Sequence, residues 1–222
     1  MATASEAVSI GVGEVGLAGD LALPGAARGV VAFAHGSGSS RHSPRNRAVA
    51  EVLQEAGLGT LLMDLLTGDE ERVDVVTAEL RFDIPLLGRR MTAAVDWLQD
   101  RPDTGDLPVG LFGASTGAAA ALVAAAERPE RVRAVVSRGG RPDLAGAALA
   151  GVRAPVLLIV GGHDQEVLRL NEEAARQLSA LCTLRVIPGA THLFEEPGTL
   201  EQAAGAARDW FLRMSPESGP DG

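Results

Sequence analysis

The stretch GLFGASTGAAAA, residues 110–121, places Ser115 between two glycines directly after an apolar run. Its pentapeptide GASTG fits the pattern G-x-S-x-G, in which a serine occupies a sharp turn between a strand and a helix. The chain contains 27 glycines, so the same letters also fit an ordinary glycine-rich turn. The sequence on either side of the pentapeptide has to separate these two interpretations.

That flanking sequence favours the strand-to-helix turn. The apolar run PVGLFGA precedes Ser115, and the helix-forming run STGAAAALVAAAERP follows it. A serine on such a tight turn leaves no room for side chains two residues before and after it, where Gly113 and Gly117 stand. The alanines at 118–121 would let the following helix approach the sheet closely. We therefore expect Ser115 to be an exposed nucleophile.

The rest of the chain alternates short apolar runs with amphipathic or alanine-rich segments. The first two runs, at 7–13 and 15–23, predict an antiparallel hairpin. The later runs are continuously apolar, which is typical of parallel strands buried on both faces. We expect a mostly parallel α/β sheet covered by helices on both faces. The expected later strands begin the segments 30–40, 60–66, 108–114, 132–140, 155–164 and 182–194, and the expected helices lie in 45–57, 81–100, 115–129, 142–152, 165–181 and 199–214.

Length and composition set limits on the class of protein. A chain of 222 residues suits one domain, expected here over 1–213 and followed by a disordered tail at 214–222. A net charge of −9 argues against a nucleic-acid surface, since phosphate binding needs clustered cations. No apolar run is long enough to cross a bilayer, so no membrane partner is expected.

Cysteine content and the first residues favour a cytoplasmic protein, either a monomer or a homodimer. Cys182 is the only cysteine, which rules out an internal disulfide and offers no metal-ligand spacing. The N-terminal sequence lacks a basic region followed by an apolar one, so no secretory signal is predicted. No cofactor motif or metal site is expected either.

Three chemically distinct residues follow three of the predicted strands. In a parallel sheet, sites lie outside the carboxyl ends of the strands. The loops there contain Ser115, Asp164 and His192, in the chain order Ser, Asp, His. A serine hydroxyl needs a base to remove its proton, and His192 can serve as that base and then as the acid for the leaving group. Asp164 would hold the imidazole in the required tautomer, with Glu166 and Asp143 as competing candidates.

The developing oxyanion needs backbone donors that are already in place. Thr116, at the first turn of the helix after the serine, offers one N–H. The second should come from the loop His35-Gly36-Ser37-Gly38 after the third strand. Ser37 is the preferred donor, with Gly36 and Gly38 as alternatives, and we expect His35 to brace this loop through hydrogen bonds.

Together these segments resemble the serine α/β-hydrolase superfamily, and within it the small dienelactone-hydrolase-like proteins. The resemblance rests on HGSGSS, GASTG, GGHDQEV and GATHLF and covers nearly the whole chain. It implies an α/β-hydrolase fold, a Ser-His-Asp triad and hydrolysis of an ester bond. Dienelactone hydrolases themselves use a cysteine nucleophile, whereas this chain has Ser115, and Cys182 lies outside any such motif. This departure argues against dienelactone as the substrate.

The sequence favours an open site for a small acyl substrate. Only residues 139–154 separate the sixth strand from the strand that leads to Asp164, so we expect no large lid domain. The loop at 65–82 is the one remaining candidate to cover the site. The expected activity is hydrolysis of a small ester, lactone or thioester. A non-catalytic binding protein and an acyltransferase with the same triad remain alternatives.

All 20 basic residues are arginines, and four of them stand near the expected site. Arg41, with Arg45 and Arg47, follows the oxyanion loop and could attract a carboxylate substrate; pairing with Glu70 or Glu71 would be a structural alternative. Arg138 follows the strand after the serine helix. It could border the pocket, or it could brace loops, with Asp143 as the expected partner.

Overall fold

One eight-stranded sheet forms the centre of the molecule. A computed structural model describes residues 3–214, so the tail predicted from residue 214 lies, from 215 onward, outside the described residues. The strand order is β1-β2-β4-β3-β5-β6-β7-β8, with β1 and β2 antiparallel and the others parallel to one another, which confirms the predicted sheet. The strands are β1 (Ser5–Val12), β2 (Val15–Ala22), β3 (Val30–Ala34), β4 (Gly59–Met63), β5 (Val109–Ala114), β6 (Val132–Arg138), β7 (Val156–Gly161) and β8 (Cys182–Ile187).

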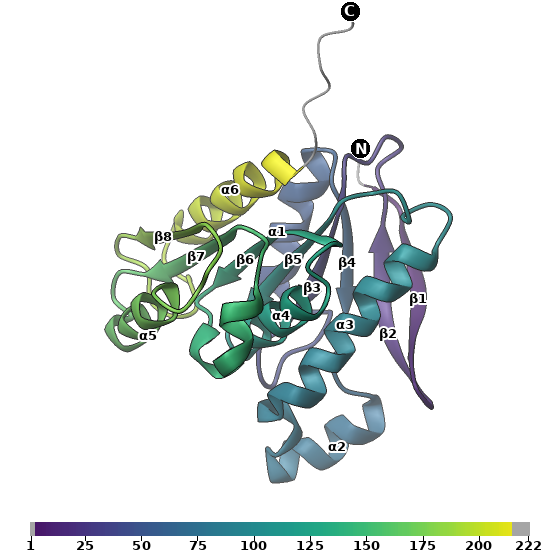
Figure 1. Ribbon diagram of the computed structural model, residues 1–222, viewed down its shortest axis with the longest axis horizontal. Helices are drawn as coiled ribbons and strands as arrows, with labels where there is room; N and C mark the ends of the chain where they lie inside the picture. The colour runs from purple at the N-terminus through teal and green to yellow at the C-terminus, as the bar shows by residue number, and fades with distance from the viewer. Residues whose placement is uncertain (1–2, 215–222) are drawn as a thin grey trace, which may run out of the picture.

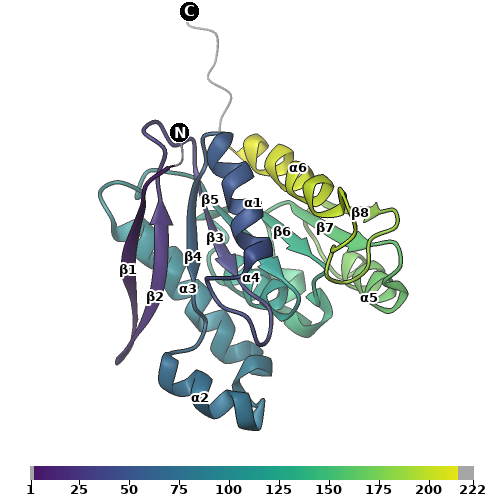
Figure 2. The ribbon, with the colours of Figure 1, turned by 180° about the vertical axis from the view of Figure 1, so that it is seen from behind.

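Helices cover both faces of this sheet (Figures 1 and 2). On one face lie α3 (Ile84–Asp100), α4 (Thr116–Glu127) and α5 (Gln165–Ala175), and on the other lie α1 (Pro44–Glu55) and α6 (Thr199–Phe211). The inner strands β3 to β7 contribute alternate side chains to two cores, one on each face of the sheet. On β3, Val30, Ala32 and Ala34 belong to the core under α3 and α4, whereas Val31 and Phe33 belong to the core under α1 and α6. This is why the strands read as continuously apolar.

Capping residues fix where the two longest early helices begin. The Ser43 side chain accepts a hydrogen bond from the Asn46 N–H at the start of α1, and the Asp83 side chain accepts one from the Leu86 N–H at the start of α3. The apolar face of α3 is buried against the sheet. It consists of Ile84, Leu87, Met91, Val95 and Leu98.

The segment at 65–82 was expected to be a loop, but part of it is helical. It contains α2 (Gly68–Thr77) and the 3₁₀ turn η1 (Leu80–Phe82), and α2 projects beyond the sheet in Figure 1. A capping box starts α2: Thr67 Oγ1 accepts from the Glu70 N–H, and the Glu70 carboxylate accepts from the Thr67 N–H. The spacing Thr-x-x-Glu is a sequence signal for a helix start, and the prediction of a loop did not take it into account.

The segment expected as a short helix at 142–152 also differs. It is the 3₁₀ segment η2 (Pro142–Gly151), kinked where Gly146 adopts φ 53° and ψ −129°. Because only this short segment lies between β6 and β7, the fold has no large lid domain at that point, as predicted. Within residues 3–214, no helix is both long and apolar enough to span a bilayer.

Candidate active site

Ser115 occupies a strained turn between β5 and α4. Its backbone has φ 51° and ψ −124°, a region that residues other than glycine rarely adopt. A Cβ at Gly113 would lie 2.3 Å from the Ala118 Cα, and one at Gly117 would lie 2.3 Å from the Ala34 carbonyl oxygen. Both distances are far inside van der Waals contact. The structure therefore confirms that Gly113 and Gly117 leave no room for a side chain.

Asp164 and His192 come together from two neighbouring loops. Asp164 follows β7 and occupies the N-cap position of α5 without a side-chain capping hydrogen bond, and His192 follows β8. The His192 Nδ1 and Asp164 Oδ2 atoms are 2.7 Å apart, which is a short charge-assisted hydrogen bond. A Cβ at Gly161 would lie 2.4 Å from the Ala190 carbonyl oxygen, so a glycine is needed for these two loops to touch.

The two competing acids have other environments. Glu166 is exposed in the first turn of α5. Asp143 forms a bidentate ion pair with Arg141, in which Nε donates to Oδ1 at 2.9 Å and Nη2 donates to Oδ2 at 2.7 Å. The hydrogen bond to His192 therefore favours Asp164 among the three candidates.

Ser115 and His192 line the same cavity, which has a volume of about 270 Å³. Gly36 and Ser37 of the loop after β3 form another part of its wall. The lining contains no aspartate or glutamate. Ser37, Ser115 and His192, which the sequence placed in three separate loops, thus line one cavity beyond the carboxyl ends of the strands.

The two expected oxyanion donors, Thr116 and Ser37, belong to segments that adjoin Ser115. Thr116 is the first residue of α4, where backbone N–H groups have no acceptor inside the helix. A Cβ at Gly36 would lie 3.0 Å from the Ser115 Cβ, so the loop after β3 approaches the serine as closely as a glycine permits. Ser37, the next residue, is exposed at the cavity wall. This arrangement is suited to holding a negative oxygen next to Ser115.

His35 braces the oxyanion loop, as expected. Its Nδ1 lies 2.9 Å from the Gly36 carbonyl oxygen and its Nε2 lies 3.0 Å from the backbone nitrogen of Leu65. The neutral ring satisfies both contacts when Nδ1–H donates to Gly36 and Nε2 accepts from Leu65. Burial lowers the pKa of His35 below its ordinary value of 6.5, which favours this neutral form.

This bracing predicts a pH-dependent contribution to stability. Because the folded pKa of His35 is depressed, its stabilising contribution is fully present above pH 6.5 and is lost as the pH falls toward the folded pKa. We expect the thermal midpoint of the wild-type protein to fall more steeply between pH 7 and pH 5 than that of His35→Gln. At pH 7.5 the variant should be about 1–2 kcal/mol less stable. Parallel curves for the two proteins would contradict this role of His35.

The arginines after the oxyanion loop pair with carboxylates that the sequence analysis did not name. Arg41 forms an ion pair with Asp64, whose Oδ1 also accepts from the Arg41 N–H at 2.7 Å. Arg47 pairs with Asp20 at 2.7 Å. The expected partner Glu70 instead binds Arg90 at 2.6 Å. Arg41 is therefore paired with a carboxylate of the fold, and it is not among the residues that line the cavity of Ser115.

Arg138 lies in the wall of the cavity, beside Ser115 and His192. It is 6% exposed, and its Nη2 donates to Asn46 Oδ1 at 3.3 Å. The guanidinium carbon lies 5.6 Å from the centre of the Phe194 ring. Asp143, the expected partner, pairs with Arg141 instead. Arg138 therefore borders the cavity, which was one of the two alternatives for it, and it does not pair with Asp143.

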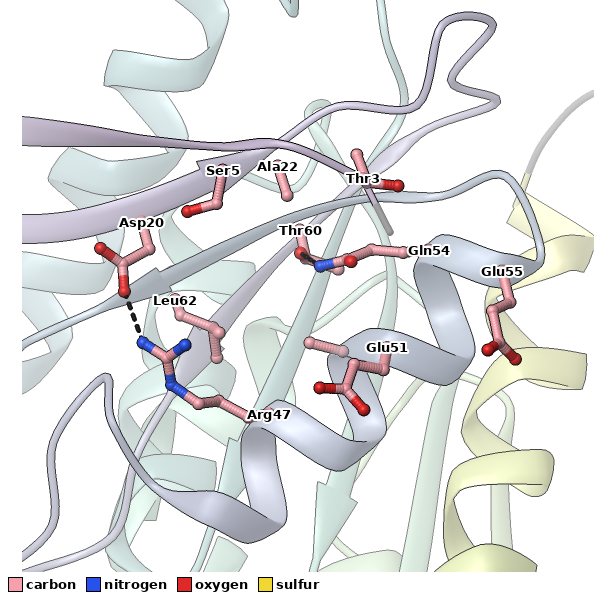
Figure 3. Close-up of a pocket in the computed structure, with 11 residues that line it drawn as sticks. Thr3, Ser5, Asp20, Ala22, Arg47, Glu51, Gln54, Glu55, Thr60 and Leu62 are labelled. Atoms are coloured by element: carbon pink, nitrogen blue, oxygen red, sulfur yellow. Dashed lines mark hydrogen bonds and ion pairs between the residues drawn. The ribbon is translucent and has the colours of Figure 1, made fainter. Parts of the chain in front are cut away.

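A second, larger groove lies between α1 and the strands β2 and β4 (Figure 3). It has a volume of about 450 Å³, and Arg47 points into it and pairs with Asp20. The carboxylates of Glu51 and Glu55 also line it. None of the three residues Ser115, Asp164 and His192 reaches this groove, so it is separate from the candidate active site.

Comparison with known proteins identifies the family. The model of the dienelactone hydrolase family matches residues 17–215. The chain belongs to the dienelactone hydrolase family. Two Mycobacterium tuberculosis proteins, from strains CDC 1551 / Oshkosh and H37Rv, are 59% identical to it over 217 residues. Both carry the name "Putative phosphoribosyl transferase"; the match covers 98% of this chain but 48% of theirs, so the chain spans about half their length.

Solved structures support the same family and fold. A dienelactone hydrolase from Anabaena variabilis is 62% identical, with a TM-score of 0.93 over 95% of this chain and 98% of that one. Est1E from Butyrivibrio proteoclasticus is 18% identical, with a TM-score of 0.77 over 94% of this chain and 98% of that one. At 18% identity, the similarity to Est1E shows a shared fold and nothing more.

Proposed function

We propose that the chain is a serine hydrolase that cleaves small carboxylic esters, lactones or thioesters. The observation that carries this proposal is the 2.7 Å contact between His192 and Asp164, beside a cavity that His192 shares with Ser115. A nucleophile, a base and a group that orients the base are the parts that acyl transfer to serine needs. The small cavity and the absence of a large lid favour short acyl groups.

In the proposed reaction, Ser115 Oγ attacks the acyl carbon while His192 Nε2 takes the hydroxyl proton. Asp164 accepts the His192 Nδ1–H and stabilises the imidazolium that forms. The backbone N–H groups of Thr116 and Ser37 hold the oxyanion. The protonated imidazole then gives its proton to the leaving alcohol or thiol, and the acyl group stays on Ser115. Water, deprotonated by His192, releases the carboxylic acid and frees the serine.

Two other functions would use the same residues. Acyl transfer to an alcohol or amine differs from hydrolysis only in the group that attacks the acyl-serine. A binding protein would keep the geometry without turnover. The phosphoribosyl transferase name belongs to proteins about twice as long as this chain, so that activity need not reside in the part that matches it.

A panel of p-nitrophenyl esters from acetate to decanoate, with one acyl thioester, tests the proposal. We expect turnover with acetate and butyrate and a fall of kcat/KM of about tenfold or more for decanoate, because the cavity is small. Product analysis with added methanol separates hydrolysis from acyl transfer, since transfer would yield mostly methyl ester. An absence of turnover across the panel in folded protein would favour the binding protein.

A further inference from the structure

A buried cation without an acidic partner lies in the wall of the cavity. Arg138 is the last residue of β6, opposite Ala114 in the register with β5, and therefore stands beside the residue that precedes Ser115. Its guanidinium contacts the Asn46 side-chain oxygen and the Phe194 ring, and its Nε has no hydrogen-bond partner. Among residues 3–214, no carboxylate lies within ion-pairing distance of it.

This arrangement is costly in the absence of an anion. Removing a charge from water is unfavourable unless a partner compensates for it, and buried arginines are normally paired. Burial and the nearby charge of Arg45 lower the pKa of Arg138 to about 10. The guanidinium therefore stays charged at neutral pH. This charge lies in the wall of a cavity where a bound anion could compensate for it.

A second element adds positive potential to the same cavity. The N-terminus of α1 faces it through Ser43 and Asn46, and a helix N-terminus attracts anions. Arg45, in the first turn of α1, also lines the cavity, although a cation there opposes the helix dipole. Its contact with Glu195 is 3.6 Å long and exposed to solvent, so it neutralises Arg45 only weakly.

We propose that this cavity binds an anionic oxo group of the substrate, a carboxylate or a phosphate monoester, through Arg138 with Arg45 at its rim. The guanidinium of Arg138 would form charge-assisted hydrogen bonds to two oxygens of that group. Because Ser115 lines the same cavity, the anion would place the scissile ester at the nucleophile. This substrate class rests on the proposed hydrolase function, whereas the anion site itself does not.

Binding of simple anions tests the site without any turnover. Inorganic phosphate and succinate are titrated separately into the protein by calorimetry at constant ionic strength. We expect at least one of them to bind the wild-type protein, with affinity reduced about tenfold or more in Arg138→Met and less in Arg138→Lys. Arg153→Met is the matched control, because Arg153 precedes β7 at the opposite end of the strands and is exposed beside Glu130.

The outcomes of this titration are distinct. Binding of phosphate alone points to a phosphorylated substrate, and binding of succinate alone to a carboxylated one. If Arg138→Met does not fold, Arg45→Met at the half-exposed rim supplies the comparison and should also weaken binding. Absence of binding of both anions to folded wild-type protein, or binding that is equal in Arg138→Met, overturns the proposal.

A matched pair of esters then connects the site to catalysis. Mono-p-nitrophenyl succinate and p-nitrophenyl butyrate differ mainly in a terminal carboxylate, and p-nitrophenyl 3-phosphonopropionate supplies the phosphonate counterpart. In wild-type protein, we expect the kcat/KM of one anionic ester to exceed that of p-nitrophenyl butyrate at least tenfold. In Arg138→Met, this ratio should fall to about one. Turnover without this preference overturns the substrate class alone. Anion binding without turnover of any ester leaves the site intact and contradicts the hydrolase.

Discussion

Replacing Ser115 with alanine is expected to lower kcat/KM for ester hydrolysis by about 10⁵-fold, close to the rate without a nucleophile. The alanine removes the only atom that forms the proposed acyl-enzyme bond, while Gly113 and Gly117 still permit the tight turn. Ser115 already has a Cβ atom at this positive φ of 51°, so an alanine adds no new steric conflict to the turn. The loss should therefore appear in catalysis and not in folding.

The control for this variant is Ser9→Ala, an exposed serine on β1 at the far edge of the sheet. Steady-state hydrolysis of p-nitrophenyl acetate and circular dichroism are measured for both variants and the wild-type protein. Ser9→Ala should retain full activity, and all three spectra should coincide. Hydrolysis by Ser115→Ala at more than about a hundredth of the wild-type rate would exclude Ser115 as the nucleophile.

Replacing Asp164 with asparagine is expected to lower kcat by about 10⁴-fold. The carboxylate accepts the Nδ1–H of His192, which leaves Nε2 free to take the serine proton. An asparagine amide can instead donate to Nδ1, and this stabilises the tautomer that carries its proton on Nε2 and cannot act as a base. The geometry changes little, so the effect comes from the position of one proton.

Glu166→Gln is the matched control, because Glu166 is two residues away and was a competing acid in the sequence. It is exposed in the first turn of α5, so its loss should change kcat less than about twofold. The rates of both variants are compared with p-nitrophenyl acetate at pH 7.5. A large loss in Glu166→Gln together with a small loss in Asp164→Asn would reverse the assignment of the acid.

The turn at Ser115 and the parallel sheet were predictable because each leaves a local pattern in the sequence. Gly113 and Gly117 are needed by any tight turn between a buried strand and a helix that packs on it, so the sequence itself shows the turn. Continuous apolar strands separated by helices indicate a parallel sheet, whose carboxyl ends meet at one edge. From the sequence alone, that rule predicts that Ser115, Asp164 and His192 lie near one another.

The partners of the arginines were not predictable in the same way. Asp20 lies on β2 and Asp64 directly follows β4, and these strands become neighbours only in the folded sheet. Nearness in sequence suggested Glu70 for Arg41, but the capping box turns Glu70 toward Thr67 and Arg90. The missing counterion of Arg138 was likewise invisible, because a sequence does not show which carboxylates fail to reach a given cation. The inference about an anionic substrate therefore depends on the structure.

The most direct measurement of the central claim is labelling of the purified protein with a fluorophosphonate probe, followed by mapping of the adduct by mass spectrometry. Such a probe reacts with a serine that an adjacent base has activated. We expect one adduct, on Ser115, and its loss in His192→Ala while the fold is retained. An unlabelled but folded wild-type protein, or an adduct on another serine, would contradict the assignment of Ser115 as the activated nucleophile.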